Sequence, residues 1–490
     1  MKNFLLIIVS IVLIFKIDAQ SIQWGPTIKT NYVLHTDLST HTGDYLGEIN
    51  GFEYYAYYDM IKWEGKLRST YFLFYETKGT TLSNFSDFGK HSYDLIGVTS
   101  SNSKICITHL STETKKNKEI KIDFYNPKTF QLENSSSLIS FYTVGKNEPF
   151  IRFVQSENKE YNLFLVYGKD AETDEKGLII TCFNKDYELV WRNIYSPNEE
   201  WNGSIGDIYI TNTGKALLHF LDYNDPKSNN IKTFHFSEIY DQEISEISQE
   251  LETPIKIIDY KLGDYSNGKY LFVYSDATNV YGSTVDFKTK STKDILNQKT
   301  YTGKWKIDKI ADLKNGKFTI AIQNRDVTTI TVKGGGSSSN KYFSWNRSFI
   351  FIGINGENDD ITFSKKLRRN YNHMQFWEPA KLQLLIEPFY FVKDGNLHLV
   401  YNTERKTEES VSNSDENPSY FYYYRARTTV KPLTKMVTIS EDGKLKVRTI
   451  MDSKEEKGTC LSKFLHLDAN NDLIIAKSIK KKATFGIVKL

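Results

Sequence analysis

Two kinds of hairpin turn alternate along this sequence, and their alternation constrains the fold more than any other feature. The first kind joins two apolar runs through an Asn-Gly-like dipeptide, which supplies the positive φ angles of a type I′ turn. The clearest copies are Asn267-Gly268, Asn315-Gly316 and Asp394-Gly395, and the weaker copies are Asn50-Gly51, Asn102-Ser103, Asn158-Lys159, Thr213-Gly214 and Asn470-Asn471. These eight dipeptides predict eight hairpins of one kind.

The second kind of turn falls once between each two successive copies of the first. The clearest example is FNKDYELV, Phe183 to Val190, and the others lie near Lys78, Pro127, Tyr240, Thr289, Gly356 and Asp442. Turns of one kind recur about every 50 to 56 residues early in the chain, near the upper end of β-propeller repeat lengths. A strand–turn–strand unit is therefore repeated along the chain.

The strands next to the two turns differ in hydrophobic pattern. Runs that follow the first turn, such as Tyr161–Tyr167, are apolar at consecutive positions, which is typical of strands covered on both faces. Strands at the second turn alternate, as in KIDFYN, where charged residues separate Ile122 from Phe124. Alternation indicates one solvated face. We therefore expect the first hairpin to be the inner pair of each blade and the second the outer pair, with Trp191 packed between blades.

These patterns predict an all-β fold, a β-propeller of four-stranded blades, with eight blades. Only three strands follow the dipeptide Asn470-Asn471, and the segment Thr27–Leu34 has no other partner. We expect this N-terminal segment to pair with the last blade, which closes the ring and removes exposed sheet edges. Seven blades remain the alternative if Asn50-Gly51 or one of the weaker turns does not form a hairpin.

The N-terminus has the pattern of a secretory signal peptide. Lys2 provides the positive charge, Phe4–Phe15 are twelve apolar residues, and Ile17-Asp18-Ala19 resembles a cleavage site. A helix of this length is about 18 Å long, short of the roughly 30 Å that a bilayer core requires. We therefore expect a signal peptide at 1–19, no membrane span, a single propeller domain at 20–490, and a periplasmic or secreted protein.

Charge and motif content exclude several classes of function. The net charge is only +3, so the chain has no electrostatic case for binding nucleic acid. No HExxH, CxxC, Walker or GxSxG motif occurs, so no catalytic residue and no cofactor are predicted. His35 and His41 lack further ligands nearby, so no metal site is predicted. Cys106, Cys182 and Cys460 are too few for a disulfide framework and are expected to be small buried residues.

Several short motifs give the chain a resemblance to a known family. They are the signal peptide, FNKDYELVW from Phe183 to Trp191, and the segments LHLVYNT, SEDGKL and ATFGIVKL near the C-terminus. Together they resemble uncharacterised secreted β-propeller-type proteins of Bacteroidetes bacteria over essentially the whole mature chain. The resemblance implies a periplasmic or exported protein and assigns no catalytic residue.

Three enlarged segments are predicted on one face of the propeller. In a four-stranded blade, the connections between the second and third strands and those between blades emerge on the same face. Residues 325–346 and 402–432 enlarge the first type of connection in the sixth and seventh units, and 368–379 enlarge the link between these units. The Gly/Ser-rich stretch Gly334–Asn340 is expected to be a flexible tip. Any partner is expected to dock on this face.

Aromatic and basic residues of these segments are the candidate binding residues. Tyr, Trp and Arg are common anchors of interfaces, and aromatic faces also suit sugar rings. The candidates are Arg368, Tyr371, His373, Trp377, Tyr422, Tyr424, Arg425 and Arg427. The competing interpretation of Tyr420–Tyr424 is a strand packed into the blade, which consecutive aromatic residues also fit.

The leading hypothesis from the sequence is a secreted, non-enzymatic propeller that binds a protein or a glycan through the loop-rich face. The alternative is a glycan hydrolase or lyase, with carboxylates from different blades meeting at the mouth of the central channel. A scaffold within an envelope complex is a third hypothesis.

Overall fold

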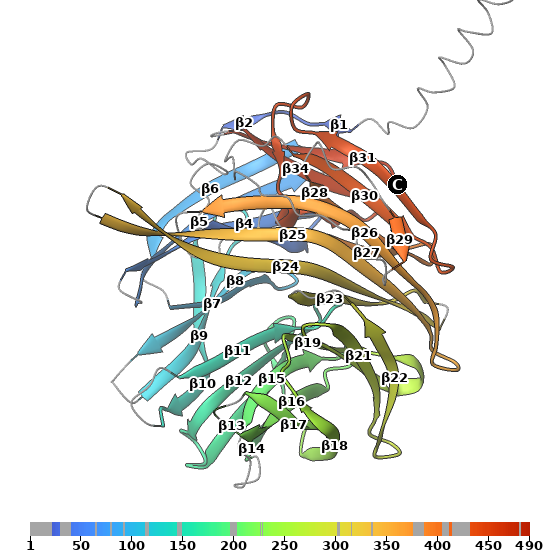
Figure 1. The fold of residues 1–490 in the computed structure, drawn as a ribbon. Coiled ribbons are helices and arrows are strands. Elements are labelled where there is room, and N and C mark those ends of the chain that lie inside the picture. Colours follow the sequence, from blue (N-terminus) through green and yellow to red (C-terminus); the bar gives the residue numbers. More distant parts are fainter. Residues whose placement is uncertain are drawn as a thin grey trace, which may run out of the picture.

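The chain is a β-propeller, in which four-stranded antiparallel sheets follow one another along the sequence (Figure 1). The computed structural model describes residues 22–29, 41–63, 66–78, 81–91, 94–112, 117–144, 149–196, 203–225, 227, 229–300, 304–314, 316–334, 337–375, 387–403, 411–413, 432–479 and 482–490. All structural statements below concern these residues.

The described strands form seven sheets, which we divide into eight successive units, because the second and third units are joined into one eight-stranded sheet by pairing of β10 with β12. The first four units contain β3 (His41–Ile49), β4 (Phe52–Trp63), β5 (Lys66–Lys78), β6 (Thr81–His91); β7 (Asp94–Ser100), β8 (Ile105–Thr112), β9 (Asn117–Tyr125), β10 (Leu132–Tyr142); β11 (Phe150–Gln155), β12 (Tyr161–Asp170), β13 (Lys176–Asn184), β14 (Leu189–Tyr195); and β15 (Gly203–Ile210), β16 (Ala216–Asp225), β17 (Asn230–Tyr240), β18 (Glu243–Ile255).

The next three units contain β19 (Asp259–Asp264), β20 (Tyr270–Ser275), β21 (Asn279–Asp286), β22 (Ser291–Lys299); β23 (Trp305–Asp312), β24 (Lys317–Gly334), β25 (Ser337–Asn355), β26 (Asp360–Gln375); and β27 (Phe389–Lys393), β28 (Asn396–Thr403), β30 (Leu433–Ile439), β31 (Leu445–Asp452). The eighth contains β32 (Thr459–Cys460), β33 (His466–Leu467), β34 (Leu473–Ile479), β35 (Lys482–Val488) and the N-terminal β1 (Gln23–Trp24) and β2 (Ile28–Lys29). One short strand, β29 (Val411–Asn413), joins the sixth unit from the insertion of the seventh.

All of the predicted turns are confirmed. The first kind joins the first and second strands of a unit, and the second kind joins the third and fourth strands. At the turn between β19 and β20, Asn267 and Gly268 have φ angles of 59° and 74°, as a type I′ turn requires. The Asn side chain tolerates this left-handed conformation and glycine adopts it without steric cost.

The predicted difference between inner and outer strands is also confirmed. Every residue of β20, a second strand, is buried. In β18, a fourth strand, the exposed and less exposed residues alternate over much of its length. First strands of neighbouring units lie beside one another, β15 by β19 and β19 by β23, so the first strands form the inner wall of the ring.

Hydrophobic residues fill the spaces between neighbouring sheets. Trp191 is 3% exposed and packs with Ile208 and Leu218 of the fourth unit. Its indole Nε1 donates a hydrogen bond of 2.9 Å to the carbonyl oxygen of Gly214 in that unit. The prediction that Trp191 packs between blades is therefore confirmed. Cys106, Cys182 and Cys460 are buried free thiols, as expected.

The N-terminal segment supplies the outer strand of the eighth unit. β1 and β2 pair with β35, Gln23 opposite Ile487 and Ile28 opposite Ala483. The pairing begins before the predicted segment Thr27–Leu34, whose residues after Lys29 lie outside the described residues. The eighth unit also packs on the first, where the ring of Tyr45 stacks on His466 with 3.7 Å between centroids.

Candidate functional site

The segment 325–346, predicted as an enlarged connection in the sixth unit, is a projecting hairpin, and residues 337–340 of the predicted flexible tip pair with β24. β24 and β25 continue to pair from Arg325 opposite Asn346 to Gly334 opposite Ser337. This β-arm, residues 325–334 and 337–346, spans about 30 Å at the rise of an extended strand, and the ends of β24 and β25 project from the molecule in Figure 1. The sequence favours strands because the run VTTITV, Val327 to Val332, is rich in β-branched residues.

A β-bulge marks the boundary between the sixth blade and the β-arm. The pairing of β25 with β24 shifts register between Asn346 and Ser348, and so does its pairing with β26. A bulge bends a strand and increases its twist. This bulge therefore sets the direction in which the β-arm leaves the blade.

Three of the predicted binding residues lie on β26, next to the β-arm. Arg368 pairs with Ser348, Tyr371 with Asn346 and His373 with Ser344. The segment 368–379 was expected to link two blades, but its residues up to Gln375 continue the fourth strand of the sixth blade. The other candidates, Trp377, Tyr422, Tyr424, Arg425 and Arg427, lie outside the described residues.

The insertion of the seventh unit reaches the sixth unit. Its residues Val411–Asn413 form β29, which pairs with Lys365–Leu367 of β26. Described residues of all three enlarged segments therefore belong to one sheet.

A buried arginine lies where these segments meet. Arg369 of β26 is 1% exposed, and its Nε donates a hydrogen bond of 3.1 Å to the carbonyl oxygen of Asn402. Its guanidinium group lies over the rings of Phe349 and Tyr401, at 5.2 Å and 5.5 Å from their centroids. Arg369 thereby fastens the outer strand of the sixth blade to the seventh blade.

Asp308, on the first strand of the sixth unit, is the carboxyl group most suited to proton transfer among these inner strands. Burial raises its pKa to about 6, although the hydroxyl of Tyr390 and the charges of Lys306, Lys261 and Arg369 lower it. The Tyr390 hydroxyl donates to its Oδ2 over 2.8 Å. Asp308 is half-buried.

Asp308 is one of three equivalent inner carboxylates, which we call the inner-strand aspartates: Asp207, Asp259 and Asp308. Each accepts a hydrogen bond from the next unit: Asp207 from the backbone N–H of Leu262 at 2.9 Å and Asp259 from that of Ile307 at 2.7 Å. Burial raises the pKa of both Asp207 and Asp259. This repetition indicates that all three connect neighbouring blades.

The inner-strand aspartates belong to no short sequence motif, but their positions relative to the repeated turns indicate them. The inner-strand aspartates precede the first-kind turns of three successive repeats by roughly six to eight residues. Superposition of the repeats on their turns places them at similar positions.

The inner turn of the third unit contacts units that are distant along the chain. This segment, the brace (residues 156–160), contacts three other units. Lys159 donates to the backbone oxygen of Tyr45 in the first unit at 3.3 Å, and Asn158 N–H donates to Asn212 Oδ1 in the fourth at 3.0 Å. Glu157 forms an ion pair with Lys309 of the sixth unit. The brace therefore joins the third unit to the first and sixth units, which are not its neighbours along the chain.

Within the described residues, no group of three or more His, Cys, Asp or Glu side chains is arranged to hold a metal ion. The part of the chain that the structure describes also contains no helix long and apolar enough to cross a membrane.

No protein-family model matches this chain, and no curated protein is similar to it in sequence. Among solved structures, it is similar to the Dos1 propeller, with a TM-score of 0.40 and 9% identity over 95% of this chain and 96% of that chain. It is also similar to the polysaccharide lyase Uly1, with a TM-score of 0.35 and 8% identity over 96% and 100% of the two chains. An α-L-arabinofuranosidase from Fusarium graminearum has a TM-score of 0.31 and 10% identity over 62% and 91%. At these scores the likeness transfers no activity to this chain.

Proposed function

We propose that this chain is a secreted propeller that binds a protein or a glycan through the face carrying the β-arm. The observation that carries the proposal is the shared sheet: the β-arm, the end of β26 and β29 are joined by strand pairing. Segments fastened in this way present a surface with a defined shape, which lowers the entropic cost of binding.

A protein partner fits this face better than a glycan. Within the described residues, β23 pairs with β24 only up to Asn324, and no strand pairs with the outer edge of the β-arm beyond Arg325. An edge strand offers backbone N–H and C=O groups to an added strand, which is a common mode of protein recognition.

Removal of the β-arm tests this proposal. In the variant, residues 325–347 are replaced by an Asn-Gly turn that joins Asn324 to Ser348, which pair with each other in the native sheet. Because the β-arm projects from the blade, we expect the variant to keep the thermal unfolding midpoint of the full chain within a few degrees. The full chain is expected to retain a partner from envelope extract or a glycan array, and the variant to lose it.

Two outcomes would contradict the proposal. In one, the partner binds the full chain and the variant equally. In the other, neither binds any partner and both hydrolyse a polysaccharide, with Asp308→Asn abolishing the hydrolysis. The second outcome would support the glycan-active alternative, which the raised pKa of the Asp308 carboxyl favours.

A further inference from the structure

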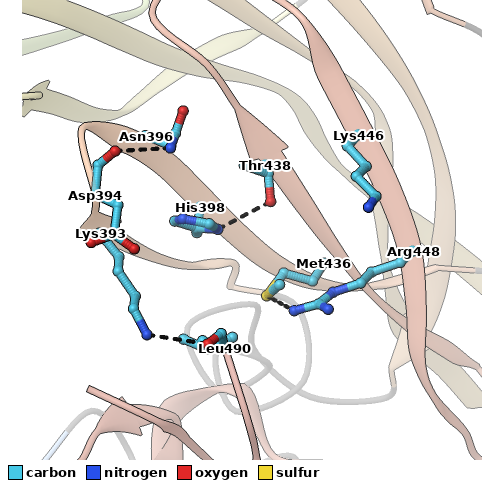
Figure 2. A pocket seen from close by; sticks show the side chains of 9 residues that line it. All are labelled: Lys393, Asp394, Asn396, His398, Met436, Thr438, Lys446, Arg448 and Leu490. Carbon is cyan, nitrogen blue, oxygen red and sulfur yellow. Dashed lines mark hydrogen bonds between the residues drawn. The ribbon is translucent and has the colours of Figure 1, made fainter. Parts of the chain in front are cut away.

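A small cavity lies on the seventh unit, at the end of its strands opposite the β-arm side. The cavity measures about 170 Å³ and is shown in Figure 2. It opens on the face of this sheet that packs against the eighth unit, where Val400 and Met436 contact Leu473. Its lining residues are Lys393, Asp394, Asn396, His398, Met436, Thr438, Lys446, Arg448 and Leu490.

Strand register brings the polar lining residues together. His398 of β28 is opposite Thr438 of β30, and Thr438 is opposite Lys446 of β31. One pair further along the sheet, Met436 is opposite Arg448. Cross-strand neighbours in a sheet have Cβ atoms about 5 Å apart and point to the same face. The side chains of His398, Thr438, Lys446 and Arg448 therefore project into one space, as Figure 2 shows.

Positive charge predominates in this cavity. Lys393, Lys446 and Arg448 are cationic, whereas the lining carries two carboxylates, the Asp394 side chain and the terminal carboxylate of Leu490. The Nη2 of Arg448 lies 3.8 Å from the Sδ atom of Met436, which is a weak acceptor. Lys393 donates to the backbone oxygen of Asn471 at 3.0 Å and to an oxygen of the terminal Leu490 at 3.5 Å, so part of its charge is compensated within the cavity (Figure 2).

The imidazole of His398 responds to this charge. Burial lowers the pKa of His398, and the positive charges of Arg448 and Lys393 lower it further. The ring is fixed by stacking on Phe391, 4.7 Å between centroids and 6° between planes, and Nδ1 lies 3.1 Å from the Thr438 hydroxyl. His398 is therefore held in one orientation beside the cationic groups, which together with burial lower its pKa although the charge of Asp394 raises it.

We propose that this cavity binds a tetrahedral oxyanion, a phosphate or sulfate group, free or as an ester on a small carrier. Arg448 and Lys446 supply charge-assisted hydrogen bonds, which are the strong kind for such anions, and Thr438 and Asn396 supply neutral donors. The volume is below the roughly 300 Å³ at which drug-sized ligand pockets begin, so it suits one anionic group rather than a whole sugar residue. This site is independent of the β-arm face.

The proposal is tested by calorimetric titration of the full chain with inorganic sulfate and inorganic phosphate, and with glucosamine 6-sulfate against glucosamine. We expect saturable binding of at least one oxyanion and none of glucosamine. Arg448→Gln and Lys446→Gln are each expected to weaken binding about tenfold or more, since a lost charge-assisted contact costs at least about 1.4 kcal/mol. Lys444→Gln is the matched control: Lys444 is 86% exposed, pairs with Asp442 and lies outside the cavity.

A second measurement separates binding at this cavity from binding elsewhere. Because binding and protonation are reciprocally linked, an oxyanion in the cavity raises the pKa of His398, and NMR titration of its imidazole detects the change. Lys446 is exposed, so Lys446→Gln is expected to fold, and its binding can be measured even if Arg448→Gln does not fold. The proposal is overturned if no oxyanion binds, if Lys446→Gln binds as well as Lys444→Gln, or if saturation leaves the His398 titration unchanged.

Discussion

His219 is fully buried in an aromatic environment, and neither ring nitrogen has a hydrogen-bond partner among the described residues. Its ring lies 4.3 Å from that of Phe272 and stacks on Phe236 at 5.2 Å between centroids. Burial lowers the pKa of His219 from 6.5 to about 3. The native state therefore binds this proton less readily than the unfolded chain.

Folding stability is expected to decrease through His219 as the pH falls. The contribution is complete above pH 6.5, the unfolded value, and decreases towards pH 3, because only the unfolded chain is protonated in that interval. Between pH 7 and pH 5 the free energy of unfolding should fall by about 2 kcal/mol through this residue. Urea unfolding at both pH values measures it, and His219→Leu should abolish this part of the slope.

His235→Leu is the control for this experiment, because His235 is a nearby histidine whose side chain is 35% exposed. Equal pH slopes for the native chain and His219→Leu would show that His219 is protonated in the folded state.

For single residues, the sequence predicts the packing of Trp191 between blades, but it predicts neither the buried position of His219 nor the contacts of the inner-strand aspartates. Trp191 follows a repeated turn, so its position in the repeat indicates its packing. His219 lies in the apolar run ALLHFL, where one polar residue gives no indication of which aromatic rings from two sheets will surround it. Such tertiary surroundings depend on the register between blades.

Single strands and turns form where the sequence predicts them when the hydrophobic pattern and the turn residues indicate the same structure. The predicted hairpins form because flanking apolar runs and, at most turns, a positive-φ residue specify them locally, whereas the turn at Asn102-Ser103 forms without one. The β-arm is the exception. Its Gly/Ser-rich end predicts a flexible tip, whereas the β-branched residues before it extend β24 and pair with β25 as far as Gly334 opposite Ser337. The strand β29 pairs with β26 of another unit, and no local signal specifies that partner.

The connection between first strands can be tested at Asp259. Asp259→Ala removes the acceptor of the Ile307 N–H bond and leaves a donor unsatisfied, so the free energy of unfolding should fall by about 1–3 kcal/mol. Asp259→Asn keeps an oxygen acceptor and should lose less than half as much. Chemical denaturation measures both, and equal losses for the two variants would show that the hydrogen bond is not the stabilising contact.

The whole molecule is held by contacts between neighbouring units and by the brace. Separate hydrophobic clusters lie between the third and fourth, fourth and fifth, and fifth and sixth units. The brace differs because Glu157 of the third unit pairs with Lys309 of the sixth.

Cross-linking tests whether the brace joins the third and sixth units in solution. In the double variant Glu157→Cys with Lys309→Cys, a short bis-maleimide reagent is expected to join the two positions, since their side chains form an ion pair. The native cysteines are buried, so they should react slowly. Cross-linking shows as faster migration of the unfolded chain on a denaturing gel.

Glu157→Cys with Lys444→Cys is the control pair, because Lys444 lies at an outer turn of the seventh unit. Equal cross-linking of both pairs, or of neither, would contradict the position of the brace.

The brace also changes how much entropy the ring gains when the contact between two neighbouring units breaks. In a ring held only by contacts between neighbouring units, loss of the contact between two units opens the ring into one long flexible chain of units. The ion pair between the third and sixth units divides this opened chain into shorter loops. Because the entropy gained on opening grows with loop length, loss of one contact between units gains less conformational entropy as long as the ion pair between the third and sixth units is intact. We therefore expect the contact formed by this short turn to couple the opening of the third and sixth units.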